Sequence, residues 1–204
     1  MRPRFVLLAL VATLAVAASA CVGDPPSGQG AGGPATTVAP APASPPAPAE
    51  AAPKTTRPAP KGVIAADRRQ PAPPLQVTDF DGNTVTLARL RGKPVVVNFF
   101  ESWCVVCRTE QDDLDEVAED FRGKVQFIGV SNNDTVSEGR KYQRDYEIPY
   151  PLANDSSGRT WATWRVPYQP VTVVVDRQGR IAWRFDGGLE PGQLDPVLEY
   201  VVGA

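Results

Sequence analysis

Two cysteines separated by two residues carry the chemistry that the sequence supports most clearly. Cys104 follows directly after Trp103, and Val105 and Val106 separate it from Cys107. A cysteine in the first turn of a helix faces unpaired backbone N–H groups and the positive end of the helix dipole, and both favour the thiolate. The second cysteine returns to the same face one turn later, where its thiol can attack a mixed disulfide formed at the first. The spacing therefore predicts a reversible dithiol/disulfide with Cys104 as the nucleophile and Cys107 as the resolving thiol.

The cysteine and histidine counts argue against a metal centre. A CxxC is as often half of a zinc site as a redox pair, so the spacing alone is a weak signal. The 204 residues hold three cysteines and no histidine, which is too few ligands for the usual four-ligand structural zinc site. The net charge of -2, without a basic stripe, argues against a nucleic-acid partner. We expect no metal and no cofactor.

The N-terminus has the pattern of an export signal. Residues 1–20 combine arginines, an apolar run and small residues before a cleavage point. The small residues before Cys21 resemble a bacterial lipobox, although Ala18 stands where leucine is usual. This predicts lipidation of Cys21 and a location outside the cytoplasm, anchored by lipid to the outer face of a bacterial cell membrane. The alternative is ordinary cleavage that leaves Cys21 as an unpaired thiol. No apolar run is long enough for a transmembrane helix after processing.

Composition divides the remainder into two parts. Residues 21–74 are rich in Pro, Ala, Gly, Ser and Thr and hold few large apolar side chains, so they cannot offset the entropy cost of ordering and are expected to form a disordered tether. Residues 75–204 have the length and apolar patterning of one domain. The predicted organisation is a signal peptide at 1–20, the lipidated N-terminus and tether at 21–74, and a redox domain at 75–204.

Apolar periodicity within this domain predicts alternating strands and helices. A continuous apolar run at residues 94–100 is typical of a central strand that is covered on both faces. The order of a hairpin, a β-α-β-α segment and a closing hairpin with a helix favours a sheet with parallel strands at its centre. The pattern predicts strands at residues 75–78, 84–87, 94–100, 125–130, 171–175 and 180–185, and helices at 104–121, 136–146 and 191–202.

The segment 90–104, LRGKPVVVNFFESWC, resembles the signature of the TlpA/ResA/DsbE group of extracytoplasmic thioredoxin-like proteins. The resemblance implies an α/β thioredoxin-like fold with an N-terminal β-hairpin extension and a central mixed sheet flanked by helices. It also implies a protein disulfide oxidoreductase that acts on exported thiol proteins or apocytochrome c, in cytochrome c maturation or oxidative folding, with a membrane redox partner. The direction of electron flow and the oligomeric state stay open.

The same resemblance assigns roles to residues around the cysteines. Pro170 takes the place of the group's cis-proline, which would turn the Gln169 backbone toward the cysteines for pairing with an extended substrate. The alternative is that Pro170 begins a strand in trans. Trp103 would lie over the active site and contact substrate, the alternative being plain core packing.

Two acidic residues flank the cysteines. Glu110 matches a carboxylate that ResA-like members keep near the active site, where it could take up or supply protons; the alternative is a solvated surface residue. Glu101 departs from the small residue usual at its place. We expect it to be exposed, and its charge to oppose thiolate formation.

Three other functions compete with disulfide exchange. Peroxiredoxin-like peroxidases need Thr three residues before the reactive cysteine, where this chain has Glu101. Sco-like copper chaperones use CxxxC and a distant histidine, and this chain has neither. A redox-inert binding module on a tether is the non-enzymatic alternative.

Overall fold

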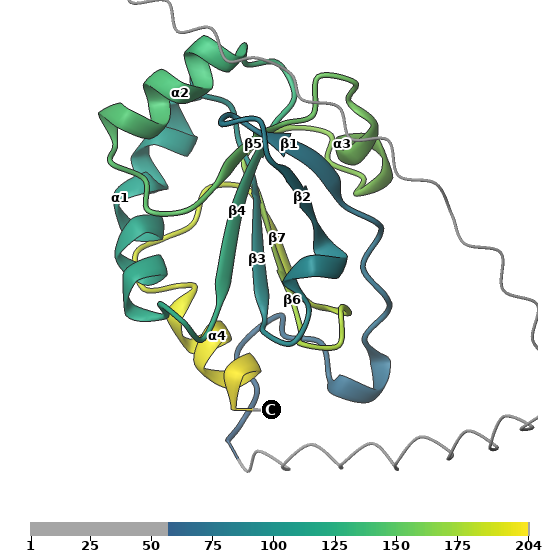
Figure 1. Ribbon diagram of the computed structural model, residues 1–204. Coiled ribbons are helices and arrows are strands. Elements are labelled where there is room, and N and C mark those ends of the chain that lie inside the picture. Colours follow the sequence, from purple (N-terminus) through teal and green to yellow (C-terminus); the bar gives the residue numbers. More distant parts are fainter. Residues whose placement is uncertain (1–56, 204) are drawn as a thin grey trace, which may run out of the picture. The chain divides into compact units, whose positions relative to one another are not determined.

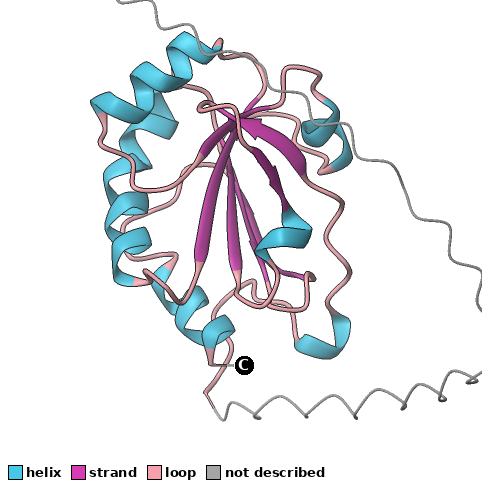
Figure 2. Cartoon of the chain, in the orientation of Figure 1, coloured by secondary structure: helices cyan, strands magenta, loops and turns pink. Residues whose placement is uncertain are grey.

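The computed structural model describes residues 57–203, which form a mixed β-sheet with helices on both faces (Figure 1, Figure 2). Its strands are β1 (Gln76–Asp79), β2 (Thr84–Thr86), β3 (Val95–Phe99), β4 (Gln126–Ser131), β5 (Leu152–Asn154), β6 (Val171–Val175) and β7 (Ile181–Asp186). Its helices are α1 (Val105–Asp120), α2 (Val136–Asp145), α3 (Arg159–Thr163) and α4 (Asp195–Val202), with 3₁₀ turns η1 (Ala66–Arg68) and η2 (Leu87–Leu90).

The strand order is β2-β1-β5-β4-β3-β6-β7. β4 pairs in parallel with β3 and with β5, and the remaining pairs are antiparallel. Successive residues of β3 point to opposite faces, so Val96 packs into one core cluster while Val97 and Phe99 pack into the other. Both faces of β3 are buried, and this explains why its sequence is a continuous apolar run. The expected mixed sheet with an N-terminal hairpin is confirmed.

Helices cover the two faces unequally. Leu114 of α1, Tyr142 of α2 and Leu198 of α4 share one core cluster, so these three helices lie on the same face of the sheet (Figure 1). Trp161 of α3 belongs to the cluster on the other face, together with Trp164. The helix that carries the cysteines is therefore anchored along its length to the central strands.

Some elements differ from the sequence pattern. β5 and α3 were not expected, because three and five residues are too few to show periodicity. The last helix begins at Asp195 rather than at residue 191, and Pro196 occupies its first turn, a position that proline favours. The other expected strands and helices are present to within about two residues, the usual uncertainty of an element end.

Part of the expected tether lies against the domain. Residues 60–72 run along β7, where Ile64 N–H donates to the Ala182 carbonyl at 2.8 Å and Ile181 N–H donates to the Gln70 carbonyl at 2.8 Å. The indole of Trp183 donates to the Lys61 carbonyl at 3.3 Å. The predicted start of the folded domain at residue 75 is therefore too late, because backbone hydrogen bonds along a strand edge leave little trace in composition.

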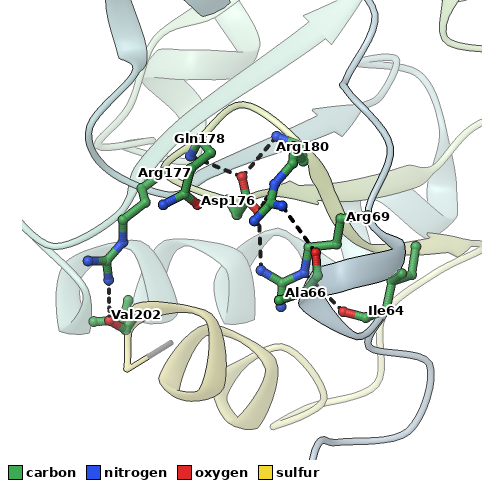
Figure 3. Close-up of polar contacts among 8 residues, drawn as sticks. All are labelled: Ile64, Ala66, Arg69, Asp176, Arg177, Gln178, Arg180 and Val202. Carbon is green, nitrogen blue, oxygen red and sulfur yellow. Dashed lines mark hydrogen bonds and ion pairs between the residues drawn. The ribbon is translucent and has the colours of Figure 1, made fainter. Parts of the chain in front are cut away.

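A buried ion pair holds this segment in place (Figure 3). Arg69 Nη1 lies 3.2 Å from Asp176 Oδ2, and both side chains are almost fully buried. The same carboxylate receives Arg180 Nε at 3.0 Å and the backbone N–H of Gln178 at 3.0 Å. Arg69 Nε also donates to the Ile64 carbonyl at 2.9 Å. The Asp176 turn thus fastens the incoming chain to β7.

Within residues 57–203, none of the helices combines the length and the apolar character that crossing a membrane requires. The predicted signal peptide and the lipid site at Cys21 lie outside the described residues and stay predictions.

Candidate active site

The two cysteines form a disulfide at the N-terminus of α1. Their Cα atoms are 5.3 Å apart. Cys104 is the N-cap residue, and its Sγ accepts the backbone N–H of Cys107 at 3.2 Å. Cys104 is 7% exposed and Cys107 is 1% exposed. A thiolate at Cys104 would receive this N–H and the positive end of the helix dipole, so the geometry favours Cys104 as the attacking sulfur.

Exposed apolar side chains lie next to the cysteines in the chain and on the loop before β6. Trp103, Val105 and Val106 are 58%, 69% and 48% exposed, and Tyr168 on the loop before β6 is 53% exposed. Core packing, the alternative considered for Trp103, is therefore wrong. Exposed apolar side chains gathered at one site mark a surface for another molecule. Gln169, which follows Tyr168, is half-buried.

Pro170 lies at the same end of the sheet as the cysteines. The Gln169–Pro170 peptide bond is cis, as predicted. Phe99, the last residue of β3, pairs with Val171, the first residue of β6. Pro170 directly precedes Val171, and the cysteine loop directly follows Phe99. The two loops therefore lie at the same end of these neighbouring strands.

Glu110 is buried on the cysteine-bearing helix. It is 2% exposed, so the alternative of a solvated surface residue is wrong. Its Oε1 accepts Asn98 Nδ2 at 3.2 Å, and its Oε2 accepts the backbone N–H of Leu189 at 2.6 Å. Burial raises the pKa of Glu110 to about 7, although these two hydrogen bonds act in the opposite direction. The carboxyl therefore changes protonation near neutral pH, one turn beyond Cys107.

The loop after β7 closes over this carboxyl. Gly187 N–H donates to the Pro170 carbonyl at 2.9 Å. A Cβ placed on Gly188 would lie 2.5 Å from Val106 Cγ1, so the backbone approaches the CxxC segment more closely than other residues allow. Sequence reasoning missed this loop, because its contacts are made by backbone N–H groups that any residue except proline supplies.

Glu101 is buried, which contradicts the expectation that it is exposed. It has no exposed surface, and its carboxylate accepts Ser131 Oγ at 2.8 Å and the Asn132 N–H at 3.1 Å. The pKa of Glu101 is raised, chiefly because burial disfavours its charged form. The hydrogen bonds from Ser131 and Asn132 act in the opposite direction, and the nearby charge of Asp134 adds to the rise. Asp134 in turn accepts the N–H of Ser102 at 2.9 Å.

Within residues 57–203, no group of three or more His, Cys, Asp or Glu side chains is arranged to hold a metal ion.

Comparison with known proteins points to thiol chemistry. The profile of the AhpC/TSA family matches residues 69–184. The thiol-disulfide oxidoreductase ResA of Bacillus cereus is 27% identical over 131 residues, which cover 64% of this chain and 76% of the relative. The soluble secreted antigen MPT53 of Mycobacterium tuberculosis is 33% identical over 121 residues, which cover 59% of this chain and 66% of the antigen.

Solved structures of disulfide oxidoreductases are also similar to this chain. A secreted disulfide oxidoreductase of Mycobacterium tuberculosis, homologous to DsbE of E. coli, superposes with a TM-score of 0.58 at 26% identity, covering 62% of this chain and 95% of that one. A DsbF homologue from Corynebacterium diphtheriae gives a TM-score of 0.61 at 26% identity, covering 68% of this chain and 90% of the other. The family match contains both cysteines, Glu110 and Pro170.

Proposed function

This chain belongs to the AhpC/TSA family and is a thiol-disulfide oxidoreductase, and from that premise we propose that it works outside the cytoplasm, exchanging disulfides with exported proteins. The observation that carries the proposal is the Cys104–Cys107 disulfide at a helix N-terminus, beneath exposed apolar side chains.

The exchange uses the two cysteines in a fixed order. In the reductive direction, the Cys104 thiolate attacks one sulfur of a substrate disulfide and forms a mixed disulfide, while the other substrate sulfur leaves as a thiolate and takes up a proton. Cys107 then attacks Cys104 Sγ and releases the second substrate thiol. Two electrons pass to the substrate, and the internal disulfide forms. The oxidative direction is the reverse of these steps.

Glu110 accepts and returns the thiol proton of Cys107 in this scheme. Cys107 is 1% exposed, so bulk water has poor access to its thiol proton. Glu110 lies one helical turn further along α1, and its pKa of about 7 allows it to accept a proton when Cys107 attacks and to return it when the disulfide is reduced.

An extended segment of an exported protein fits the surface around Cys104. Trp103, Val105, Val106 and Tyr168 offer apolar contact area. The half-buried Gln169 offers its backbone for strand-like pairing. A cysteine-containing stretch of an unfolded protein supplies both an apolar side chain and free backbone groups, whereas a small peroxide supplies neither.

Location outside the cytoplasm is supported by the export signal at residues 1–20 and by the relatives, two of which are named as secreted proteins. The lipid anchor at Cys21 and a membrane redox partner belong to the same proposal. Apocytochrome c as a substrate stays a prediction, since the names of these relatives do not mention it.

Reduction of insulin disulfides and reactivation of scrambled ribonuclease test the proposal, with Cys104→Ser as the control. The wild-type chain is expected to be active in at least one assay, and the variant to be inactive. No activity of the wild type in either assay would mean a redox-inert module, equal activity of the wild type and the variant would contradict the role of Cys104, and peroxide consumption without disulfide exchange would favour a peroxidase. A reduction potential near about -120 mV would then identify an oxidant, and one below about -250 mV a reductant.

A further inference from the structure

The loop that leads to Cys104 carries a buried carboxylate. Glu101 stands between the end of β3 and the nucleophile and has no exposed surface. A buried carboxylate is costly unless hydrogen bonds compensate for its lost hydration. Disulfide exchange as described above makes no use of Glu101, so the buried carboxylate at this place points to another role.

The donors to this carboxylate all come from one segment at the end of β4. Oε2 accepts Ser131 Oγ at 2.8 Å, and Oε1 accepts the backbone N–H groups of Asn132 and Asn133, both at 3.1 Å. The side-chain amide of Asn133 donates to Oε1 at 3.2 Å. A single side chain thereby joins the cysteine loop to the loop between β4 and α2.

Four further hydrogen bonds connect this contact with the residues around the nucleophile. The backbone carbonyl of Glu101 accepts the N–H of Cys104 at 3.0 Å. Ser102 donates its N–H and its hydroxyl to Asp134, at 2.9 and 2.7 Å. Asp134 N–H in turn donates to Ser131 Oγ at 3.1 Å. Glu101 and Ser102 are thus held on both side-chain and backbone atoms.

We propose that Glu101 is a positioning residue for the disulfide exchange: by fastening the cysteine loop to residues 131–133, it holds Cys104 at the N-terminus of α1 in the orientation that exchange requires. Glu101 contacts no reacting atom. Its effect passes through the Glu101 carbonyl to the Cys104 N–H, and so to the position of Cys104 Sγ opposite the N–H of Cys107. The inference rests on the exchange activity of the cysteine pair.

Two substitutions separate position from charge. Glu101→Gln keeps the shape and one acceptor oxygen, and Ser131 Oγ can accept from the new amide because a hydroxyl both donates and accepts. Glu101→Ala removes every hydrogen bond of the side chain and leaves the backbone carbonyl in place. If position matters, the glutamine variant retains function and the alanine variant loses it. If the negative charge matters, the two variants behave alike.

The experiment measures the pH dependence of Cys104 alkylation by iodoacetamide, located by peptide mapping, and the rate of insulin reduction. For Glu101→Ala we expect both rates at pH 7 to fall at least about tenfold and the pKa of the Cys104 thiol to rise, since small displacements of reacting groups cost large factors in rate. Glu101→Gln is expected within about threefold of the wild type. Glu116→Ala, at an exposed carboxylate of α1, is the control and should change nothing.

Wild-type alkylation and insulin rates in Glu101→Ala would overturn the proposal, and so would an equal loss in Glu101→Gln. A lower melting temperature with an unchanged thiol pKa would mean a merely structural role. Should Glu101→Ala fail to fold, Ser131→Ala removes one donor and must shift both readouts in the same direction to a smaller extent. If the wild type does not reduce insulin, the exchange function fails, while the alkylation profiles still test the role of Glu101.

Discussion

The backbone N–H of Leu189 donates to Glu110 Oε2 at 2.6 Å, although 79 residues separate them in the chain. Asn98 Nδ2 occupies the other carboxylate oxygen at 3.2 Å and also donates to Thr172 Oγ1 at 3.1 Å. The carboxyl is therefore enclosed by α1, β3 and the loop after β7. This enclosure raises the pKa of Glu110 to about 7 by burial and separates the group from solvent on the cysteine-bearing helix.

Glu110→Gln should remove a titration from the exchange rate. The wild-type rate is expected to inflect near pH 7 as Glu110 gains and loses its proton, and the variant should lose this inflection and about a hundredfold in rate at neutral pH. Rates measured by rapid mixing between about pH 5 and pH 9 check this.

Asp115→Asn is the matched control. Burial also raises the pKa of Asp115 to about 7, but its carboxylate accepts from Gln111 at 2.7 Å rather than facing the loop after β7. Its pH profile should match the wild type. A profile altered equally by both substitutions would show that Glu110 has no special part in the exchange.

The same burial predicts how stability depends on pH. The carboxyl has a pKa of about 7 when folded and about 4.5 when unfolded, so between these values the folded state binds more protons. The free energy of unfolding must then decrease as pH rises through this window, by about 3 kcal/mol from Glu110. Urea unfolding at several pH values should give a shallower decline for Glu110→Gln. An unchanged slope would mean that the carboxyl is not buried.

Gly188→Ala should destabilise the chain through one identifiable clash. The added methyl group would lie 2.5 Å from Val106 Cγ1, and overpacking of this kind costs about 1–3 kcal/mol. Val106→Ala removes the opposing methyl group, so the double variant should recover most of the loss. A double-mutant cycle from urea unfolding measures the coupling, and strictly additive effects would contradict the proposed contact.

Asp176→Asn should be far more damaging than loss of a surface ion pair. It leaves the buried Arg69 guanidinium without its carboxylate, which costs about 3–5 kcal/mol. Glu119→Gln, which breaks the exposed pair with Arg122, should leave the melting temperature unchanged.

By the same reasoning, a chain that begins at residue 57 should keep its melting temperature, and one that begins at residue 75 should lose stability. Equal melting temperatures would contradict the packing of residues 60–72.

The sequence predicted most of the strands and helices, because a buried face requires a regular spacing of apolar residues. The apolar run of β3, the helix after Cys104 and the closing hairpin followed from periodicity, and the resemblance to the TlpA/ResA/DsbE group is confirmed. The cis bond before Pro170 is confirmed as well. The resemblance suggested it, since proline favours cis only weakly.

Burial of charged residues was where sequence reasoning failed. A glutamate side chain is normally solvated, so the residue type at position 101 did not indicate an inward side chain, and at position 110 only the resemblance pointed to a place near the active site. The partners that compensate for this burial are the distant Ser131 and Asn98 and the backbone N–H of Leu189. Spacing along the chain cannot show such contacts, because the fold brings them together.

The ordered roles of the two cysteines are tested most directly by trapping a mixed disulfide. The reduced full-length variants Cys107→Ser and Cys104→Ser are mixed with oxidised glutathione, and peptide mapping by mass spectrometry separates the active-site adduct from any adduct at Cys21. We expect a stable glutathione adduct on Cys104 in the first variant and little adduct on the buried Cys107 in the second. Faster or equal modification of Cys107 would contradict the assignment of Cys104 as the nucleophile.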